Sequence, residues 1–279
     1  MHPGVILAVS AALAFGAADF VGGVGSRRHS SWHIVLVGQA AGALVMLVAA
    51  SMLPGSPVTT DFAWAVLAGV GSATGSIFLF RGLARGRMGL VAPISAVGAA
   101  ALPVLVGVTL GERHSWLVWM GVLAALPGIW LVSRDPTSTR PGQTRGALVD
   151  GALAGTGFGV LFVALARVSD DAGMLPMAAI QFVGAVLTLV VIVTRRQPWR
   201  PRRGVVGWGS ASGLLGASGT LSFMVATGNT SLAVAAVLAS LYPVVTVLLA
   251  AGLVGERIDA GQRTGIGICT IAVATLALA

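Results

Sequence analysis

The stretches VTLGER at residues 108–113 and GLVGER at residues 252–257 end in the same tripeptide, Gly-Glu-Arg. The two copies stand 144 residues apart in a chain of 279 residues, so the offset is about half of the chain. When the sequence is shifted by this offset, Trp64 also aligns with Trp208. A self-match at one long period indicates a repeated unit. The chain is therefore predicted to contain the same structural unit twice.

The boundaries of the two units follow from composition. A stretch rich in Pro, Thr and Arg occupies residues 134–146 and is typical of a linker. We therefore predict a first repeat at 1–133 and a second at 147–279. Towards the N-terminus of each repeat the offset drifts by a residue or two, and Gln39 then matches Gln181.

The composition indicates an integral membrane protein. Hydrophobic residues make up 56% of the chain, charged residues 9%, and the mean hydropathy is +0.92. Apolar runs of about 20 residues, the length that crosses a bilayer as a helix, can be marked out ten times. These runs lie at about 4–25, 33–53, 62–83, 88–110, 115–133, 147–167, 174–194, 204–226, 231–253 and 261–278.

Five crossings per repeat is an odd number, so the second repeat must have the opposite orientation in the membrane. The arginines agree with this inversion, because the alternating loops place 15 of the 17 on one side and only Arg113 and Arg167 on the other. The majority side has Arg27, Arg28, Arg81, Arg85, Arg87, Arg134, Arg140, Arg145, Arg195, Arg196, Arg200, Arg202, Arg203, Arg257 and Arg263. Since cytoplasmic loops carry the excess of basic residues, both termini are predicted to lie outside the cytoplasm.

Several classes of function are disfavoured. The net charge of +8 is spread over short loops and forms no basic domain, so we expect no nucleic-acid partner. The single Cys269 offers no disulfide and no metal set, and we expect no metal and no cofactor. Gly216-Ala217-Ser218-Gly219 resembles the serine motif of rhomboid proteases, but all four histidines precede it. The chain is therefore predicted not to be an enzyme.

Asp19 is the clearest candidate for a functional charge, because ionisable groups inside a membrane are costly and are functional hypotheses by default. It precedes Arg27 by eight residues, which places it about 12 Å deeper along a helix. Its carboxylate is suited to take up a proton, to bind a cationic group of a substrate or to pair with an arginine. The alternative is that it reaches polar groups near the interface and only orients the first helix.

Three further polar residues are candidates for substrate binding or coupling. Arg81 near the end of the third run is suited to neutralise Asp19 or hold a substrate carboxylate; the alternative is that it extends to the interface. Gln39 and Gln181 occupy matching places in the second and seventh runs and offer donors and an acceptor to a central cavity. Hydrogen bonding between helices accounts for the two glutamines equally well.

The only tyrosine, Tyr242, directly precedes Pro243 inside the ninth run. Proline removes a backbone hydrogen bond and bends a helix, so a cavity wall with a gating kink is predicted here. Pro93 and Pro103 give the fourth run, its counterpart, comparable kinks, although neither aligns with Pro243. Ordinary packing of kinked helices is the alternative.

The repeated tripeptide itself is interpreted as a helix boundary. Gly111 and Gly255 are suited to end a helix as left-handed residues after its last turn. Glu112 and Glu256 then lie before the next helix, where a negative charge suits the helix dipole.

Residues 223–257 read FMVATGNTSLAVAAVLASLYPVVTVLLAAGLVGER, and this text resembles the second repeat of EamA-type transporters in the drug/metabolite transporter superfamily. The first repeat shows the pattern more weakly in FRGLARGRMGLVAPISAV at 80–97, and Ala99 stands where the family often has a proline. The resemblance implies ten helices around a central cavity that is lined by both halves. It also implies that the protein moves small metabolites, amino acids or drugs by alternating access.

These observations together predict an all-α membrane protein with ten transmembrane helices in two inverted five-helix repeats. The expected function is secondary active transport, with export of a small solute coupled to protons or to exchange. A lipid-handling flippase and a non-transporting membrane interaction protein are the alternatives. The expected partners are a small-molecule substrate, protons and membrane lipid, and the protein is expected to be a monomer or homodimer. The absence of Lys and the abundance of Ala, Gly and Arg favour a bacterial cytoplasmic membrane.

Overall fold

The computed structural model describes residues 3–52, 54–84, 88–111, 115–133, 144–198, 200–255 and 257–278, and the regular elements in these residues are all helices. In chain order they are α1 (Pro3–Arg28), α2 (Ser31–Met52), α3 (Thr59–Ala84), α4 (Met88–Thr109), α5 (Trp116–Ser133), α6 (Thr144–Leu165), the short 3₁₀ helix η1 (Asp170–Ala172), α7 (Leu175–Thr194), α8 (Arg203–Thr227), α9 (Leu232–Ala239), α10 (Tyr242–Leu249), the π-helical turn η2 (Ala250–Val254) and α11 (Ala260–Leu278). Each of the ten predicted apolar runs coincides with helical structure, and the ninth run coincides with α9, α10 and η2 together.

Two glycines of the repeated tripeptide end their helices as predicted. Gly111 follows α4 with φ +87°, and Gly255 follows η2 with φ +74°. Residues with a Cβ rarely adopt this left-handed conformation, so glycine at both positions lets the chain leave the helix. Glu112, Arg113 and Glu256 lie outside the described residues, as does 134–143 of the predicted linker.

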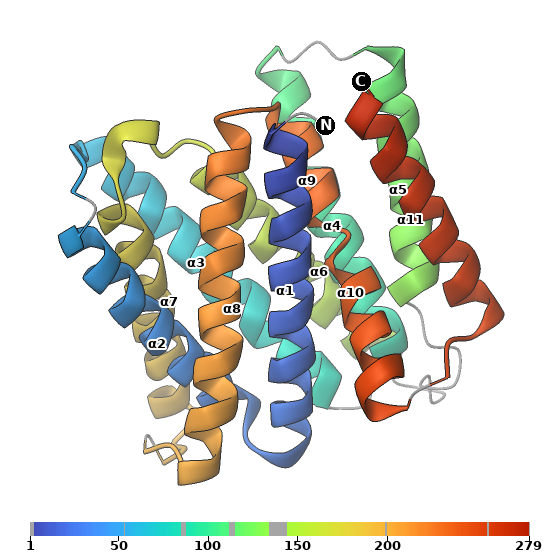
Figure 1. Ribbon diagram of the computed structural model, residues 1–279. Helices are drawn as coiled ribbons and strands as arrows, with labels where there is room; N and C mark the ends of the chain where they lie inside the picture. Colours follow the sequence, from blue (N-terminus) through green and yellow to red (C-terminus); the bar gives the residue numbers. More distant parts are fainter. Residues whose placement is uncertain are drawn as a thin grey trace.

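The helices of the two halves are interleaved (Figure 1). From the first half, α1 packs on α8, α2 on α7 and α8, and α3 and α4 both pack on α6. At one side of the bundle α5 packs on α11, the last helix of each half. The most extensive helix contacts therefore join the first half of the chain to the second.

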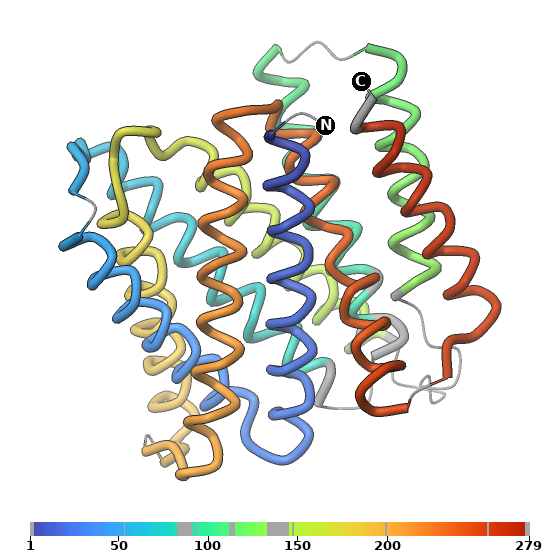
Figure 2. Tube along the Cα trace, viewed as in Figure 1, coloured from blue at the N-terminus to red at the C-terminus, as the bar shows by residue number. Residues whose placement is uncertain are grey.

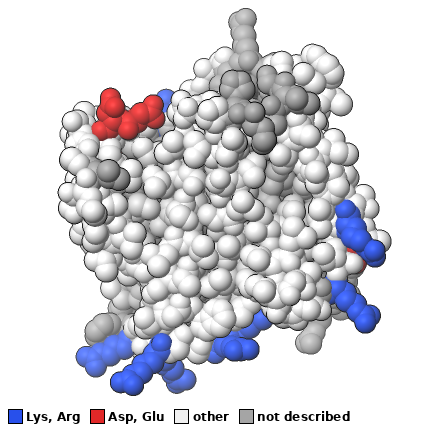
Figure 3. Space-filling model, in the orientation of Figure 1, with Lys and Arg blue, Asp and Glu red and all other residues white. Residues whose placement is uncertain are grey.

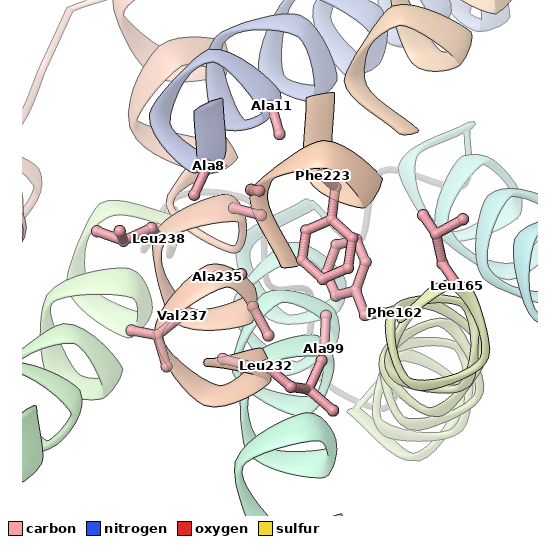
Figure 4. Packing of buried hydrophobic residues seen from close by; sticks show 14 of the residues in the cluster. Ala8, Ala11, Ala99, Phe162, Leu165, Phe223, Leu232, Ala235, Val237 and Leu238 are labelled. Atoms are coloured by element: carbon pink, nitrogen blue, oxygen red, sulfur yellow. The ribbon is translucent and has the colours of Figure 1, made fainter. Parts of the chain in front are cut away.

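The main hydrophobic core surrounds α9, whose eight residues are all buried (Figure 4). Phe162 of α6 and Phe223 of α8 stack there with ring centroids 4.5 Å apart. Ala99 of α4 and Ala8 of α1 are also fully buried in this core. Small residues on α1 and α4 thus leave room for large side chains from α6 and α8.

Glycines let neighbouring helices approach closely where the halves meet. A Cβ added at Gly213 of α8 would overlap the backbone of Gly38 in α2. A Cβ added at Gly157 of α6 would lie within about 3 Å of backbone atoms of Gly71 and Gly75 in α3. The abundance of glycine in α3 and α8 is therefore explained by backbone contact between helices, as in other membrane bundles.

The outer surface of the bundle is apolar. Large side chains such as Leu44, Leu105 and Phe182 are more than 60% exposed. By length and composition, six helical segments of the described chain are apolar enough to cross a membrane: 3–28, 31–52, 59–82, 148–165, 175–194 and 232–254. Exposed apolar surface on this scale is suited to lipid and not to water. The chain is therefore a multi-pass membrane protein.

The two ends of the bundle differ in charge. Both termini lie at one end, which is the upper end in Figures 1 and 2. Basic side chains gather mainly towards the opposite end, whereas η1 carries exposed Asp170 and Asp171 at the end that holds the termini (Figure 3). The arginines of the described residues are thus concentrated away from the termini.

The ninth predicted run is interrupted inside the bundle. α9 ends at Ala239, and α10 begins at Tyr242 with Pro243 in its first turn. Because Pro243 has no N–H, the carbonyl of Ala239 has no helical hydrogen-bond donor four residues later. Comparable kinks were predicted at Pro93 and Pro103, but α4 continues through both prolines without interruption. The side chain of Pro93 lies outside the described ones.

Candidate functional site: a cavity between the two halves

A cavity of about 90 Å³ lies where the halves of the chain meet. Its walls come from α1, α2 and α3 of the first half, from α6, α7 and α8 of the second, and from α10. The polar lining residues are Asp19, Gln39, Ser72, Ser76, Gln181, Ser212, Thr220 and Tyr242. The lining phenylalanines are Phe15, Phe80, Phe158 and Phe162. The cavity is thus a mixed polar and aromatic chamber, shared by both halves.

Asp19 faces this cavity from α1, and its helix is held by hydrogen bonds to two other helices. Ser212 of α8 donates to the carbonyl oxygen of Ala18 at 2.9 Å. Thr246 of α10 donates to the carbonyl oxygen of Gly16 at 3.1 Å. Within the described part of the chain, the Asp19 carboxylate itself has no hydrogen-bond or ion-pair partner. A partly buried carboxylate is therefore held at the cavity wall without a protein group that neutralises it.

Gln39 and Gln181 also line the cavity, and their packing is reciprocal. A Cβ at Gly184 would clash with the side chain of Gln39, and a Cβ at Gly42 would clash with that of Gln181. Gln39 Nε2 donates to Ser72 Oγ at 2.9 Å, while Gln39 Oε1 is buried and accepts no hydrogen bond from the described residues. Each glutamine thus crosses over a glycine of the opposite half, beside the cavity.

Tyr242 lines the cavity from the first turn of α10, directly after the helix break. Its hydroxyl is buried and lies close to the hydroxyl of Ser95 on α4, with which it interacts. The hydroxyl of Ser240 in the break is buried and has no hydrogen-bond partner among the described residues. The break therefore brings polar atoms into an otherwise hydrophobic part of the core.

Arg81, which was predicted to contact Asp19 or a substrate, is directed elsewhere. It does not line the cavity; its guanidinium forms an ion pair with Asp150 of α6, and its Nε lies 3.1 Å from Asp150 Oδ1. The guanidinium also lies over the ring of Phe78, 4.3 Å from the centroid. The side chain of Asp150 is only 2% exposed. Arg81 therefore joins α3 to α6 and does not pair with Asp19.

A second carboxylate joins α3 to the second half at the opposite end of the helix. Asp61 Oδ1 accepts hydrogen bonds from the backbone N–H of Ser169 at 2.9 Å and from its hydroxyl at 2.8 Å. Asp61 Oδ2 accepts from the N–H of Val58 at 2.8 Å. Asp61 and Arg81 thus attach both ends of α3 to the chain around α6.

The sequence reasoning did not identify Asp150, Asp61 or the serines and threonine of the cavity. Asp150 and Asp61 had a usable signal, since each is an acidic residue in or beside a predicted apolar run. Ser72, Ser76 and Thr220 had none, because hydroxyl residues are common in membrane helices. In the described chain, His, Cys, Asp and Glu side chains form no group of three that could hold a metal ion.

The fold and the site define a class of protein: a multi-pass helical membrane protein with a polar and aromatic chamber between its two halves. Comparison with known proteins names the family. The EamA-like transporter family matches residues 2–134 and again residues 147–278, and the chain belongs to this family. It is accordingly a membrane transporter of the drug/metabolite type, a class that handles small molecules and is not enzymatic.

Comparison with solved structures supports the fold. A structure titled "Crystal structure of protein" superposes with a TM-score of 0.76 over 99% of this chain and 96% of that chain. The two sequences are 16% identical, so this likeness concerns the fold alone. No curated protein matches the chain.

Proposed function

We propose that the protein is a secondary active transporter that exports a small solute by alternating access, coupled to protons or to exchange. The observation that carries this proposal is the cavity itself. It is walled by three helices of the first half and four of the second, and it holds a carboxylate, Asp19, that has no hydrogen-bond or ion-pair partner among the described residues. Secondary transporters place their substrate site in this way, at the interface of two repeats.

The inverted arrangement of ten membrane helices is part of the proposal. Gln39 and Gln181 are counterparts in the two halves, and so are Gly42 and Gly184, which follow them by three residues. Gln39 packs on Gly184 and Gln181 packs on Gly42, and this reciprocal packing supports a twofold relation between the halves. The two family matches, at 2–134 and 147–278, support the division into repeats at 1–133 and 147–279 with a linker at 134–146.

The orientation follows from the charges. We propose that the arginine-rich end of the bundle faces the cytoplasm of a bacterial cell and that both termini lie outside it. Figure 3 supports this orientation, since basic side chains gather towards the end opposite the termini. Asp19 is proposed to carry the coupling proton, and the only other ionisable side chain that lines the cavity from the described residues is Tyr242.

The test is the access to the cavity from each side of the membrane. Ser76 lines the cavity, and Ser76→Cys changes one atom of its side chain. In a Cys269→Ala background this variant has one thiol, because Cys269 is the only natural cysteine. We expect a membrane-impermeant maleimide to modify the thiol in right-side-out and in inside-out vesicles alike. The Cys269→Ala protein without the second change serves as the unlabelled control.

The other outcomes identify the alternatives. Protection from both sides would indicate a packed bundle, as expected for a non-transporting interaction protein. Modification only by a maleimide dissolved in the bilayer would indicate a groove open to lipid, as expected for a flippase. Modification from one side only would contradict alternating access.

A further inference from the structure

The charge of the cavity favours one sign of substrate. Asp19 is the one formally charged residue that lines it, and no Arg, Lys or His belongs to its described wall. Arg81 is held outside by its ion pair with Asp150. A carboxylate inside a membrane protein is neutralised either by a proton or by a paired positive charge, and a bound cation supplies such a charge.

Beside Asp19, the cavity wall holds several hydrogen-bond acceptors. Ser212 donates its hydroxyl proton to the carbonyl of Ala18, and Thr220 donates its proton to the carbonyl of Gly216 at 3.0 Å. Each of these hydroxyls therefore presents lone pairs to the cavity. Gln39 Oε1 is a further buried acceptor without a donor among the described residues. Such a wall is suited to a ligand that carries several N–H donors.

The aromatic side chains of the wall support the same ligand chemistry. Four phenylalanines and Tyr242 line a space of about 90 Å³. Aromatic faces attract cations in desolvated sites, and aromatic rings also accommodate an apolar body. Pockets for drug-sized ligands have volumes of roughly 300–1,000 Å³. The cavity in this conformation is smaller and suits a compact solute.

We propose that the central cavity binds a compact protonated amine, with its ammonium group at Asp19 and Gln39 and its apolar body against the phenylalanines. This inference rests on the proposed transport function and names the substrate class of that same site. It also disfavours amino acids, because the described wall has no cation for an α-carboxylate.

The test uses three probes that share one apolar body and differ in charge: isobutylammonium, neutral isobutanol and zwitterionic valine. Each is added to Ser76→Cys/Cys269→Ala protein in lipid nanodiscs before the maleimide. We expect isobutylammonium to slow modification of the thiol at a concentration at least about tenfold below that of the other two probes. Equal protection by valine or by isobutanol would overturn the assignment of an amine site.

The role of Asp19 is tested in the same background by Asp19→Asn. We expect this change to abolish protection by isobutylammonium while the thiol is still modified in the absence of a probe, which shows that the cavity persists. Asp171→Asn is the matched control, since it makes the same chemical change at an exposed residue of η1 and should leave protection unchanged. Protection that survives Asp19→Asn would refute the placement of the ammonium group.

Failure of this inference is distinguishable from failure of the proposed function. If the thiol is modified from both sides of the membrane but no probe protects it, transport stands and the amine class is wrong. If the thiol is modified from neither side, the transport proposal and the assignment of an amine substrate both fail.

Discussion

The ion pair between Arg81 and Asp150 provides the sharpest test of how the two halves are joined. The carboxylate side chain is 2% exposed and the guanidinium side chain 17% exposed, so both charges are largely removed from water. Removing one partner of a buried ion pair destabilises a protein by about 3–5 kcal/mol, because the remaining charge stays buried. We therefore expect Arg81→Met to lower the free energy of unfolding by about 4 kcal/mol, since Asp150 cannot reach solvent.

The reverse single change should be less damaging. In Asp150→Leu the guanidinium is left near the end of α3, where it is partly exposed and keeps its contact with the Phe78 ring. We expect a loss of about 3 kcal/mol, the lower end of the range for a broken pair. The double variant Arg81→Met/Asp150→Leu removes both charges of the pair and should be more stable than either single variant, because apolar replacement of a buried pair is often nearly neutral.

The assay is reversible unfolding in mixed micelles, followed by the fluorescence of the seven tryptophans. The double-mutant cycle isolates the coupling free energy between the two residues, which we expect to be at least about 3 kcal/mol. Arg263→Met removes an exposed arginine from α11 and should change stability by no more than about 0.5 kcal/mol. A double variant that loses the sum of the two single effects would refute the reasoning, because it would show that the residues do not interact.

Two further stability effects follow from the helix contacts. Gly213→Ala places a methyl group against the backbone of Gly38 and should lower the free energy of unfolding by about 1–3 kcal/mol or more. Gly207→Ala in the same helix is the control, because its methyl group meets no atom within 4 Å and should stabilise the protein by about 0.5–1 kcal/mol. Equal thermal shifts for the two variants would contradict the close approach of α2 and α8. Asp61→Asn weakens the hydrogen bonds that the carboxylate accepts from Ser169 and should lower the free energy of unfolding by about 1–3 kcal/mol; unchanged unfolding would show that this contact does not hold α3.

The helices were predictable because membrane helices have a simple local signal. A run of about 20 apolar residues defines a crossing helix regardless of what surrounds it. Helix ends were predictable where one residue decides them: Gly111 and Gly255 adopt positive φ because glycine has no Cβ. The interruption near Tyr242 agrees with the missing backbone donor of Pro243, but a proline alone does not decide an interruption, because α4 continues through Pro93 and Pro103.

The partners of the charges were not predictable from the sequence. Arg81 and Asp150 are 69 residues apart, and Asp61 and Ser169 are 108 apart. Which residues meet depends on which helices are neighbours, and in a membrane the packing of small residues decides this neighbourhood. Arg81 was therefore predicted to pair with Asp19, to bind a substrate or to extend to the interface, whereas the structure pairs it with Asp150 of α6. The direction of the Ser212 hydroxyl proton was not predictable either, because its acceptor is the carbonyl oxygen of Ala18 on another helix.

The interleaving of the halves limits how this fold can move. The most extensive packing joins α3 and α4 to α6, α1 and α2 to α8, and α5 to α11, so few large interfaces lie within one half. A movement of one whole half against the other would break nearly all of these contacts at once, including the ion pair and the Asp61 hydrogen bonds that attach both ends of α3. A movement of α3, α4 and α6 against α1, α2 and α8 keeps the packing of α3 and α4 on α6 and of α1 and α2 on α8, and it divides the bundle at α7, which packs on both α2 and α3. It changes the cavity directly, because Ser76 and Phe158 lie on one side of that division and Asp19 and Ser212 on the other. If the proposed alternating access occurs, its moving units therefore combine helices from both halves.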